Sequence, residues 1–252
     1  MSELRKKNRV TVKPISAPKP YDILANQLRE SILRGDILEG DALPTERELV
    51  DQTGLTRGSV REALRVLAVE GLVQTRQGRF GGNVVTLPGN ASMANAVSQF
   101  VRGRRLPLRT IHETRETLEP ALAKFAAIHR SEEDLQKLRA IHEDLVASAG
   151  SLQEFSVNNI KWHNAVAEAS GNELLSSILY SISYGVAVST TTEEYDTVET
   201  RKAVIRIHSR INEAIEKQDP ALAEKLMRQH IGATDARAVA PGTTEIPLSD
   251  EK

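Results

Sequence analysis

The sequence predicts a mainly α-helical protein: an N-terminal winged helix-turn-helix with a small β-hairpin, then an all-helical bundle of six or seven helices. Three observations support this prediction. Two short helical stretches lie on either side of Gly54. A run of alternating and β-branched residues, typical of a hairpin, follows them at 72–88. Beyond residue 90, apolar residues recur at three- and four-residue steps, and glycine or proline marks the breaks.

The composition is that of a soluble globular chain. Its 252 residues are 40 % hydrophobic and 27 % charged, and the formal net charge is −1, so a surface for a polyanion must be local. Cysteine is absent, which excludes disulfides and thiolate metal sites. The first residues lack the apolar core of a signal peptide, and no apolar run is long enough for a membrane span. We therefore expect a cytoplasmic protein with no membrane partner.

We expect five segments along the chain. Residues 1–20 combine several lysines and arginines with three prolines, which predicts a flexible basic arm or, equally, a disordered tail without a role. The winged helix-turn-helix is expected over 21–87. A linker and the first helix of the second domain follow at 88–107, the helical domain at 108–240 and a disordered tail at 241–252.

Three helices are expected in the first domain. The apolar spacing from Tyr21 onward predicts a helix that ends at Gly35. Thr45, followed three residues later by Glu48, has the pattern of a capping box for a short second helix that stops at Gly54. Thr56 is the expected N-cap of the third helix.

The third helix is expected to have a buried face and a basic face. Helical spacing groups four apolar residues: Val60, Ala63, Leu64 and Leu67. Three arginines share the adjoining face: Arg57, Arg61 and Arg65. Guanidinium groups bind guanine edges or phosphates in bidentate fashion, and a recognition helix reaches base edges with its N-terminal end. The alternative for each arginine is a solvated charge or an ion pair with Glu62, Glu70 or another acid.

The stretch ILRGDILEGDALPTERELVDQTGLTRGSVREALRVLAVEGLV resembles the DNA-binding domain of GntR-family bacterial transcription regulators, and the resemblance covers about residues 21–85. It implies contacts with double-stranded operator DNA at six positions: Arg47, Thr56, Arg57, Ser59, Arg61 and Gly78. Of these, Thr56 and Ser59 are the expected phosphate ligands, and Gly78 lies at the hairpin tip. The tip QGRFGGN departs from the compact Gly-x-Gly turn usual in the family.

Three histidines fall on three separate predicted helices of the second domain: His163, His208 and His230. Asn159 precedes His163 by four residues, so both share one helix face. Neutral imidazoles that converge inside a bundle bind divalent metals, and three protein ligands leave positions open for water or a small acid. Taken singly, each histidine is also explained as a surface or hydrogen-bonded residue.

Residues 111–238 resemble the all-helical effector-binding domain, called FCD, of the FadR subgroup of the same family. The segments TRETLEPALAKFAA and IHSRINEAIEKQDPALAEKLMRQHI carry this resemblance, together with the His163 helix that ends in ASGN. It implies that the three histidines bind a divalent metal ion, zinc first, with nickel or manganese as alternatives. Asn159 stands where the metal-binding members have aspartate, and its neutral amide oxygen is a weaker ligand.

Arg115 aligns with an arginine that faces the effector pocket in the family, where it would bind a carboxylate. Its alternative role is an ion pair with Glu119, four residues on. The resemblance therefore implies a homodimeric regulator, a repressor released from a palindromic operator by a small organic acid bound beside the metal. The alternative is a metal-sensing or constitutive regulator without an organic effector. An enzyme is not expected, because the His163 helix lacks an HExxH-type glutamate and Glu168 lies off the His163 face.

Overall fold

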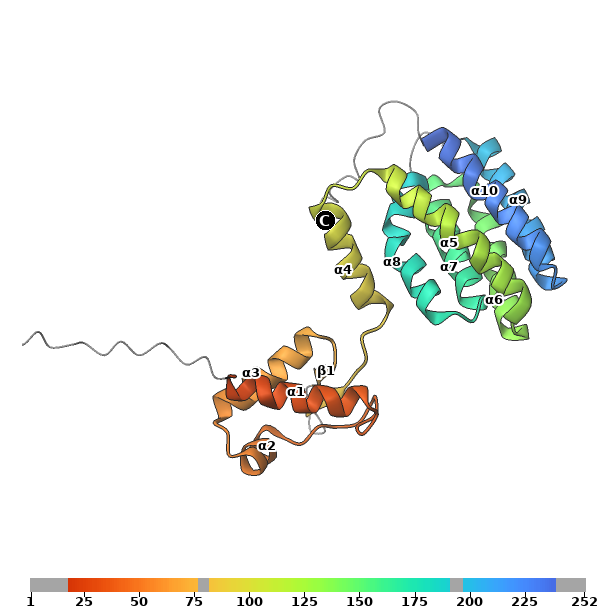
Figure 1. Ribbon diagram of the computed structural model, residues 1–252. Helices are drawn as coiled ribbons and strands as arrows, with labels where there is room; N and C mark the ends of the chain where they lie inside the picture. Colours follow the sequence, from red (N-terminus) through yellow and green to blue (C-terminus); the bar gives the residue numbers. More distant parts are fainter. Residues whose placement is uncertain (1–17, 77–81, 191–196, 239–252) are drawn as a thin grey trace, which may run out of the picture. The chain divides into compact units, whose positions relative to one another are not determined.

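The computed structural model describes residues 18–76, 82–190 and 197–238 of a chain that divides into two compact units, 1–88 and 89–252. The described residues form ten α-helices, one short 3-10 helix and two strands (Figure 1). The predicted mainly helical fold, with one small hairpin after the first three helices, is confirmed. None of the helices described combines the length and the apolar character needed to cross a bilayer.

The first unit contains three helices and one hairpin: α1 (Pro20–Leu33), α2 (Glu46–Thr53), α3 (Arg57–Val69), β1 (Val73–Arg76) and β2 (Gly82–Val85). The strands pair antiparallel, with Val73 opposite Val85. Ala42 forms an isolated bridge with Val84, so the segment before α2 runs along the open edge of β2. The hairpin tip, residues 77–81, lies outside the described residues, as does the predicted basic arm up to residue 17.

Threonine caps fix where α2 and α3 begin. Thr45 Oγ1 accepts the Glu48 amide hydrogen at 3.2 Å, and the Glu48 carboxylate accepts the Thr45 amide hydrogen at 2.7 Å. This is the predicted capping box. Thr56 Oγ1 likewise accepts the Ser59 amide hydrogen at 3.2 Å. Between the helices Gly54 has a φ of 69°, a left-handed conformation that glycine adopts without strain, so the chain turns tightly from α2 into α3.

One apolar cluster holds the first unit together. Its centre is the stripe predicted for α3, all at most 5 % exposed: Val60, Ala63, Leu64 and Leu67. Leu24 and Ile32 of α1 and the paired Val73 and Val85 of the hairpin pack against this stripe. Because α3 buries one complete side in this way, its opposite side is held in a fixed orientation toward solvent.

The second unit consists of α4 (Asn90–Gly103), α5 (Leu108–His129), α6 (Glu132–Ala147), η1 (Ser148–Gly150), α7 (Leu152–Ala169), α8 (Glu173–Thr190), α9 (Val198–Glu216) and α10 (Pro220–Ala238). In Figure 1, α10 runs beside α5 along much of its length, and α4 packs on α8. The largest buried cluster joins α5, α6, α7, α9 and α10, with Trp162, Ile211, Leu226 and Met227 among its members. The centre of the bundle is therefore where α5, α7, α9 and α10 meet.

Candidate functional site

Three histidines meet in the interior of the second unit. His163 comes from α7, His208 from α9 and His230 from α10, and none is more than 6 % exposed. Nε2 of His208 lies 3.0 Å from Nε2 of His230, which in turn lies 3.5 Å from Nε2 of His163. The fold thus brings the three predicted ligands together, each with the same ring nitrogen directed at a common point.

These separations suit a shared metal ion. Zinc binds imidazole nitrogen at about 2.0–2.1 Å in tetrahedral geometry, which places two ligand nitrogens about 3.3 Å apart. The two observed separations, 3.0 and 3.5 Å, lie on either side of that value. Burial lowers the pKa of His163, and burial with the neighbouring histidines lowers the pKa of His208 well below its usual value. Both rings are therefore neutral at pH 7, the form that binds metal.

Glu119 on α5 fixes the orientation and tautomer of His163. Its Oε2 lies 2.5 Å from Nδ1 of His163, and its Oε1 lies 2.5 Å from Nε of Arg115. Burial by itself raises the pKa of Glu119, but Arg115 and then His163 outweigh burial and bring this pKa down to about 2. An ionised carboxylate only accepts hydrogen bonds, so Nδ1 of His163 donates and Nε2 presents its lone pair to the cluster.

Arg115 is 3 % exposed and forms a buried ion pair with Glu119, one of the two roles considered from the sequence. Its Nη2 also lies 3.4 Å from Nε2 of His163. The guanidinium group therefore borders the histidine cluster while its Nε is held by Glu119. This arrangement puts a permanent positive charge beside the three ring nitrogens.

Two further side chains of α7 bear on this site, because Trp162 contacts His208 and Asn159 lies about one helical turn before His163. The Trp162 indole stacks on the His208 ring, with ring centroids 3.6 Å apart and planes inclined by 9°, and its Nε1 donates to Asn212 at 3.0 Å. Asn159 is 2 % exposed, and within the described part of the chain its Oδ1 accepts no hydrogen bond. A buried amide oxygen without a donor is costly, and it suits an oxygen that serves as a ligand.

Glu168, the acid considered as a general base, lies on the surface of α7 in an ion pair with Lys137. It follows His163 by five residues, so it faces away from the cluster. The acid that does contact His163 is Glu119, whose charge is already committed to His163 and Arg115.

The second candidate site is the basic face of α3. Arg57, Arg61 and Arg65 are all exposed, as the helical spacing predicted. Arg61 donates one hydrogen bond, from Nε to Glu46 on α2 at 2.8 Å. Arg65 donates two to Glu62 within α3, from Nε at 3.0 Å and from Nη2 at 2.7 Å. Two of the three arginines therefore form the exposed ion pairs that were the alternative to DNA contact.

The other predicted DNA contacts are placed as follows. The hydroxyl oxygens of Thr56 and Ser59 lie 3.1 Å apart at the N-terminal end of α3. Arg47 is exposed on α2. Gly78 falls outside the described residues.

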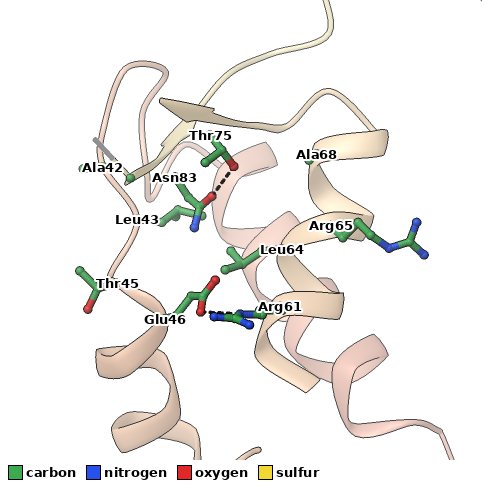
Figure 2. Close-up of a pocket in the computed structure, with 11 residues that line it drawn as sticks. Ala42, Leu43, Thr45, Glu46, Arg61, Leu64, Arg65, Ala68, Thr75 and Asn83 are labelled. Atoms are coloured by element: carbon green, nitrogen blue, oxygen red, sulfur yellow. Dashed lines mark hydrogen bonds and ion pairs between the residues drawn. The ribbon is translucent and has the colours of Figure 1, made fainter. Parts of the chain in front are cut away.

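An open groove of about 530 Å³ separates α2, α3 and the hairpin (Figure 2). Thr45 and Glu46 line it at the start of α2, and Arg61 and Leu64 line it on α3. On the hairpin side, Thr75 donates to Asn83 Oδ1 at 2.9 Å. No sequence pattern indicated this groove, because it depends on the spacing of elements that approach each other only in the folded chain.

Known proteins resemble both units. Residues 20–80 match the family described as "Bacterial regulatory proteins, gntR family", and residues 110–233 match the FCD domain. The HTH-type transcriptional repressor NanR of Enterobacter sp. (strain 638) is 25 % identical over 228 residues, which cover 89 % of this chain and 87 % of that protein. The Uxu operon transcriptional regulator of Escherichia coli (strain K12) is 29 % identical over 233 residues, covering 88 % of this chain and 82 % of the relative.

The solved structure of Streptococcus agalactiae GntR superimposes with a TM-score of 0.68 at 24 % identity and covers 86 % of this chain and all of that one. This likeness confirms the fold. The two matched domains, in the same order as the two structural units, identify the class of protein. The chain belongs to the GntR family and is a transcription regulator, not an enzyme, with a helix-turn-helix DNA-binding domain and an FCD effector domain.

Proposed function

We propose that the protein is a homodimeric repressor that leaves a palindromic operator when a small organic acid binds beside a metal ion in the second unit. The observation that carries this proposal is the convergence of three buried Nε2 atoms next to the guanidinium group of Arg115. The relatives named above as a repressor and an operon regulator support the regulatory part. Such a regulator acts on chromosomal DNA and thus in the cytoplasm.

In this proposal the metal is held by His163, His208 and His230, with the amide oxygen of Asn159 as a fourth ligand. Zinc is the expected ion, with nickel or manganese as alternatives. A bound divalent ion would supply a positive charge and, with five or six ligands in all, one or two positions for water or the effector. The protein ligands are all neutral, so that charge is not cancelled by the ligand set and favours an anionic effector.

Arg115 contributes a second positive charge for the effector carboxylate. Glu119 keeps its guanidinium group in place through Nε, and Nη2 faces the cluster beside His163. An effector held by these groups touches side chains from α5, α7, α9 and α10. Effector binding that favours one arrangement of these helices changes the affinity for DNA, and by linkage DNA binding changes the affinity for the effector by the same free energy.

DNA contact is proposed for α3 and its surroundings. Arg57 and Arg61 read base edges in the major groove, Arg47 contacts a base or the backbone, and Thr56 and Ser59 bind phosphate. Gly78 at the hairpin tip allows close approach of the backbone to DNA. Two protomers related by two-fold symmetry present this surface to the two halves of the operator.

A second function, a regulator that senses the metal alone, is favoured by one observation. The guanidinium group of Arg115 and the carboxylate of Glu119, which border the histidines, already form a buried ion pair and so neutralise each other's charge. On this reading no organic effector is needed to neutralise Arg115.

One experiment tests the proposal and separates it from this alternative. A duplex enriched by the protein from a random-sequence pool serves as the operator. Metal-free protein, zinc-loaded protein and zinc-loaded protein with each of a panel of sugar acids, hydroxy acids and dicarboxylates are compared for thermal stability and affinity for this duplex. We expect one acid to raise the melting temperature and weaken DNA binding only in the zinc-loaded protein. If zinc alone changes the DNA affinity and no acid has an effect, the protein is instead a regulator that senses the metal alone.

A further inference from the structure

The ion pair between Arg61 and Glu46 joins the recognition helix to the start of α2. Arg61 Nε donates to Glu46 Oε2 at 2.8 Å, across 15 positions of the chain. Figure 2 shows the Arg61 side chain directed across the groove toward Glu46, whereas Arg65 points away from it. Glu46 is the first residue of α2, where the positive end of the helix dipole holds a carboxylate in place.

This pair uses only one side of the guanidinium group. Among the described residues, the single hydrogen bond of Arg61 goes from Nε to Glu46, which leaves both terminal nitrogens available. Two parallel N–H groups on one edge are what guanine O6 and N7 accept in the major groove. Glu46 therefore binds Nε of Arg61, and the edge formed by Nη1 and Nη2 is left for a base.

The neighbouring ion pair of α3, between Arg65 and Glu62, engages more of its guanidinium group. Arg65 contacts Glu62 through both Nε and Nη2, so one complete edge of its guanidinium group is taken. The two arginine side chains are equally exposed, at 69 %, and the two glutamates are similarly exposed, at 39 % and 36 %. The Arg65 pair thus has the same charges at similar exposure, but it lies within α3 and engages one more nitrogen of the guanidinium group.

Glu46 also carries a negative charge within the surface assigned to DNA. A carboxylate there opposes contacts between Arg61 and phosphates, which every DNA sequence offers. It does not oppose the bidentate contact with guanine to the same extent, because that contact is directed away from the carboxylate. The combined effect favours particular sequences over the backbone in general.

We propose that Glu46 is a specificity-determining residue that positions Arg61 for guanine recognition and suppresses its binding to phosphate. This inference rests on the proposed contact of Arg61 with bases. It assigns Glu46 a role in selecting sequence rather than in stabilising the fold, since exposed ion pairs contribute little to stability.

The test compares Glu46→Ala with the matched variant Glu62→Ala. Wild-type protein first enriches a preferred duplex from a random-sequence pool. Affinities for this duplex and for a scrambled duplex of the same length are then measured by fluorescence anisotropy at several salt concentrations. We expect Glu46→Ala to bind the scrambled duplex more tightly and the preferred duplex less tightly, so that the ratio of the two affinities falls roughly tenfold. Glu62→Ala should leave this ratio within about twofold of wild type.

Two further variants separate positioning from charge. Glu46→Gln keeps an oxygen that accepts from Arg61 Nε, so it should still enrich the wild-type sequence while its affinity for scrambled DNA rises. In an Arg61→Ala background, Glu46→Ala should change the ratio no further, because the two residues act as one unit.

Three results would overturn the inference. Equal ratios for Glu46→Ala and Glu62→Ala would show a general charge effect. Tighter binding of both duplexes by Glu46→Ala would show that Glu46 merely blocks Arg61. Failure of the wild-type protein to enrich any sequence would refute base reading by α3 itself, and with it the proposed function.

Discussion

Glu119 Oε2 and His163 Nδ1 lie 2.5 Å apart although 44 positions separate the two residues in the chain. Through this contact a residue of α5 sets which nitrogen of a ring on α7 points at the other histidines. A carboxylate that orients a metal-binding histidine typically contributes a factor of about 10–100 in metal affinity.

We therefore expect Glu119→Gln to weaken zinc binding by about 10- to 100-fold, because the amide no longer supplies a charged acceptor for Nδ1–H. Competition with a chromophoric chelator measures the dissociation constant. Glu113→Gln is the control, since Glu113 is an exposed residue of the same helix whose ion pair is with Arg109. Equal zinc affinities of the two variants would refute the orienting role of Glu119.

Asn159 offers a direct test of the fourth ligand. If its buried Oδ1 binds the metal, Asn159→Asp replaces a neutral oxygen with an anionic one, and we expect zinc affinity to rise by at least tenfold. Without metal the same variant should be less stable than wild type, because the new charge is buried. Unchanged zinc affinity in the same chelator competition would exclude position 159 from the coordination sphere.

Trp162 is the single tryptophan of the chain and stacks directly on His208. Binding of zinc at the His208 ring changes the environment of the indole, so we expect a saturable change in tryptophan emission when metal-free protein is titrated with zinc. The change should disappear in the His163→Ala, His208→Ala double variant. It should persist in His129→Ala, whose ring bonds to the Ser170 carbonyl instead. A signal that survives in the double variant would place the metal elsewhere.

Acid should destabilise the second unit in the absence of metal. Burial lowers the pKa of His208 well below the ordinary value of about 6.5, so below pH 6.5 the unfolded chain takes up a proton that the folded chain does not. Stability is then lost as pH falls, by up to about 2 kcal/mol from this residue at pH 5. Melting temperatures between pH 7.5 and 5 in excess chelator measure the loss. The melting temperature of His208→Gln should fall less steeply with pH than that of wild type. An identical pH dependence would show that His208 does not cause the loss of stability.

Arg57 is the basic residue of α3 nearest its N-terminal end, and it is exposed. If it reads a base, Arg57→Ala should weaken binding to the enriched duplex by about 1–3 kcal/mol. Arg65→Ala should cost less, because Arg65 lies two turns farther on and already forms a fork with Glu62. Anisotropy titrations of both variants measure the two losses of DNA affinity. A larger loss for Arg65→Ala than for Arg57→Ala would contradict base reading by Arg57.

The sequence predicted the elements of the fold closely because local signals mark their ends. The capping box at Thr45 begins α2, Gly54 ends it, and Pro220, one of the prolines that mark breaks beyond residue 90, begins α10. Apolar spacing was less selective for α1, because Ile23 and Leu33 belong to the three- and four-residue spacing that predicts this helix but are 47 % and 61 % exposed. Their exposure depends on what packs beside α1, which spacing alone does not contain.

The candidate sites were predictable only where single residue types indicate a chemistry. Histidines at 163, 208 and 230 stand out as residue types, and the structure brings them together. The contact of Glu119 with His163 and that of Glu46 with Arg61 join separate helices, and no periodic pattern records which residues face each other across a bundle. The stacking of Trp162 on His208 was missed for the same reason.

The three histidine ring nitrogens that meet in the second unit come from three different helices, α7, α9 and α10. A single ion shared by His163, His208 and His230 closes two long loops of the chain at one point, as a pair of disulfides would in a chain that had cysteines. Closing long loops restricts the unfolded chain far more than the folded one. Metal would then act as a removable cross-link, and its loss would loosen the helical unit while leaving the covalent chain intact.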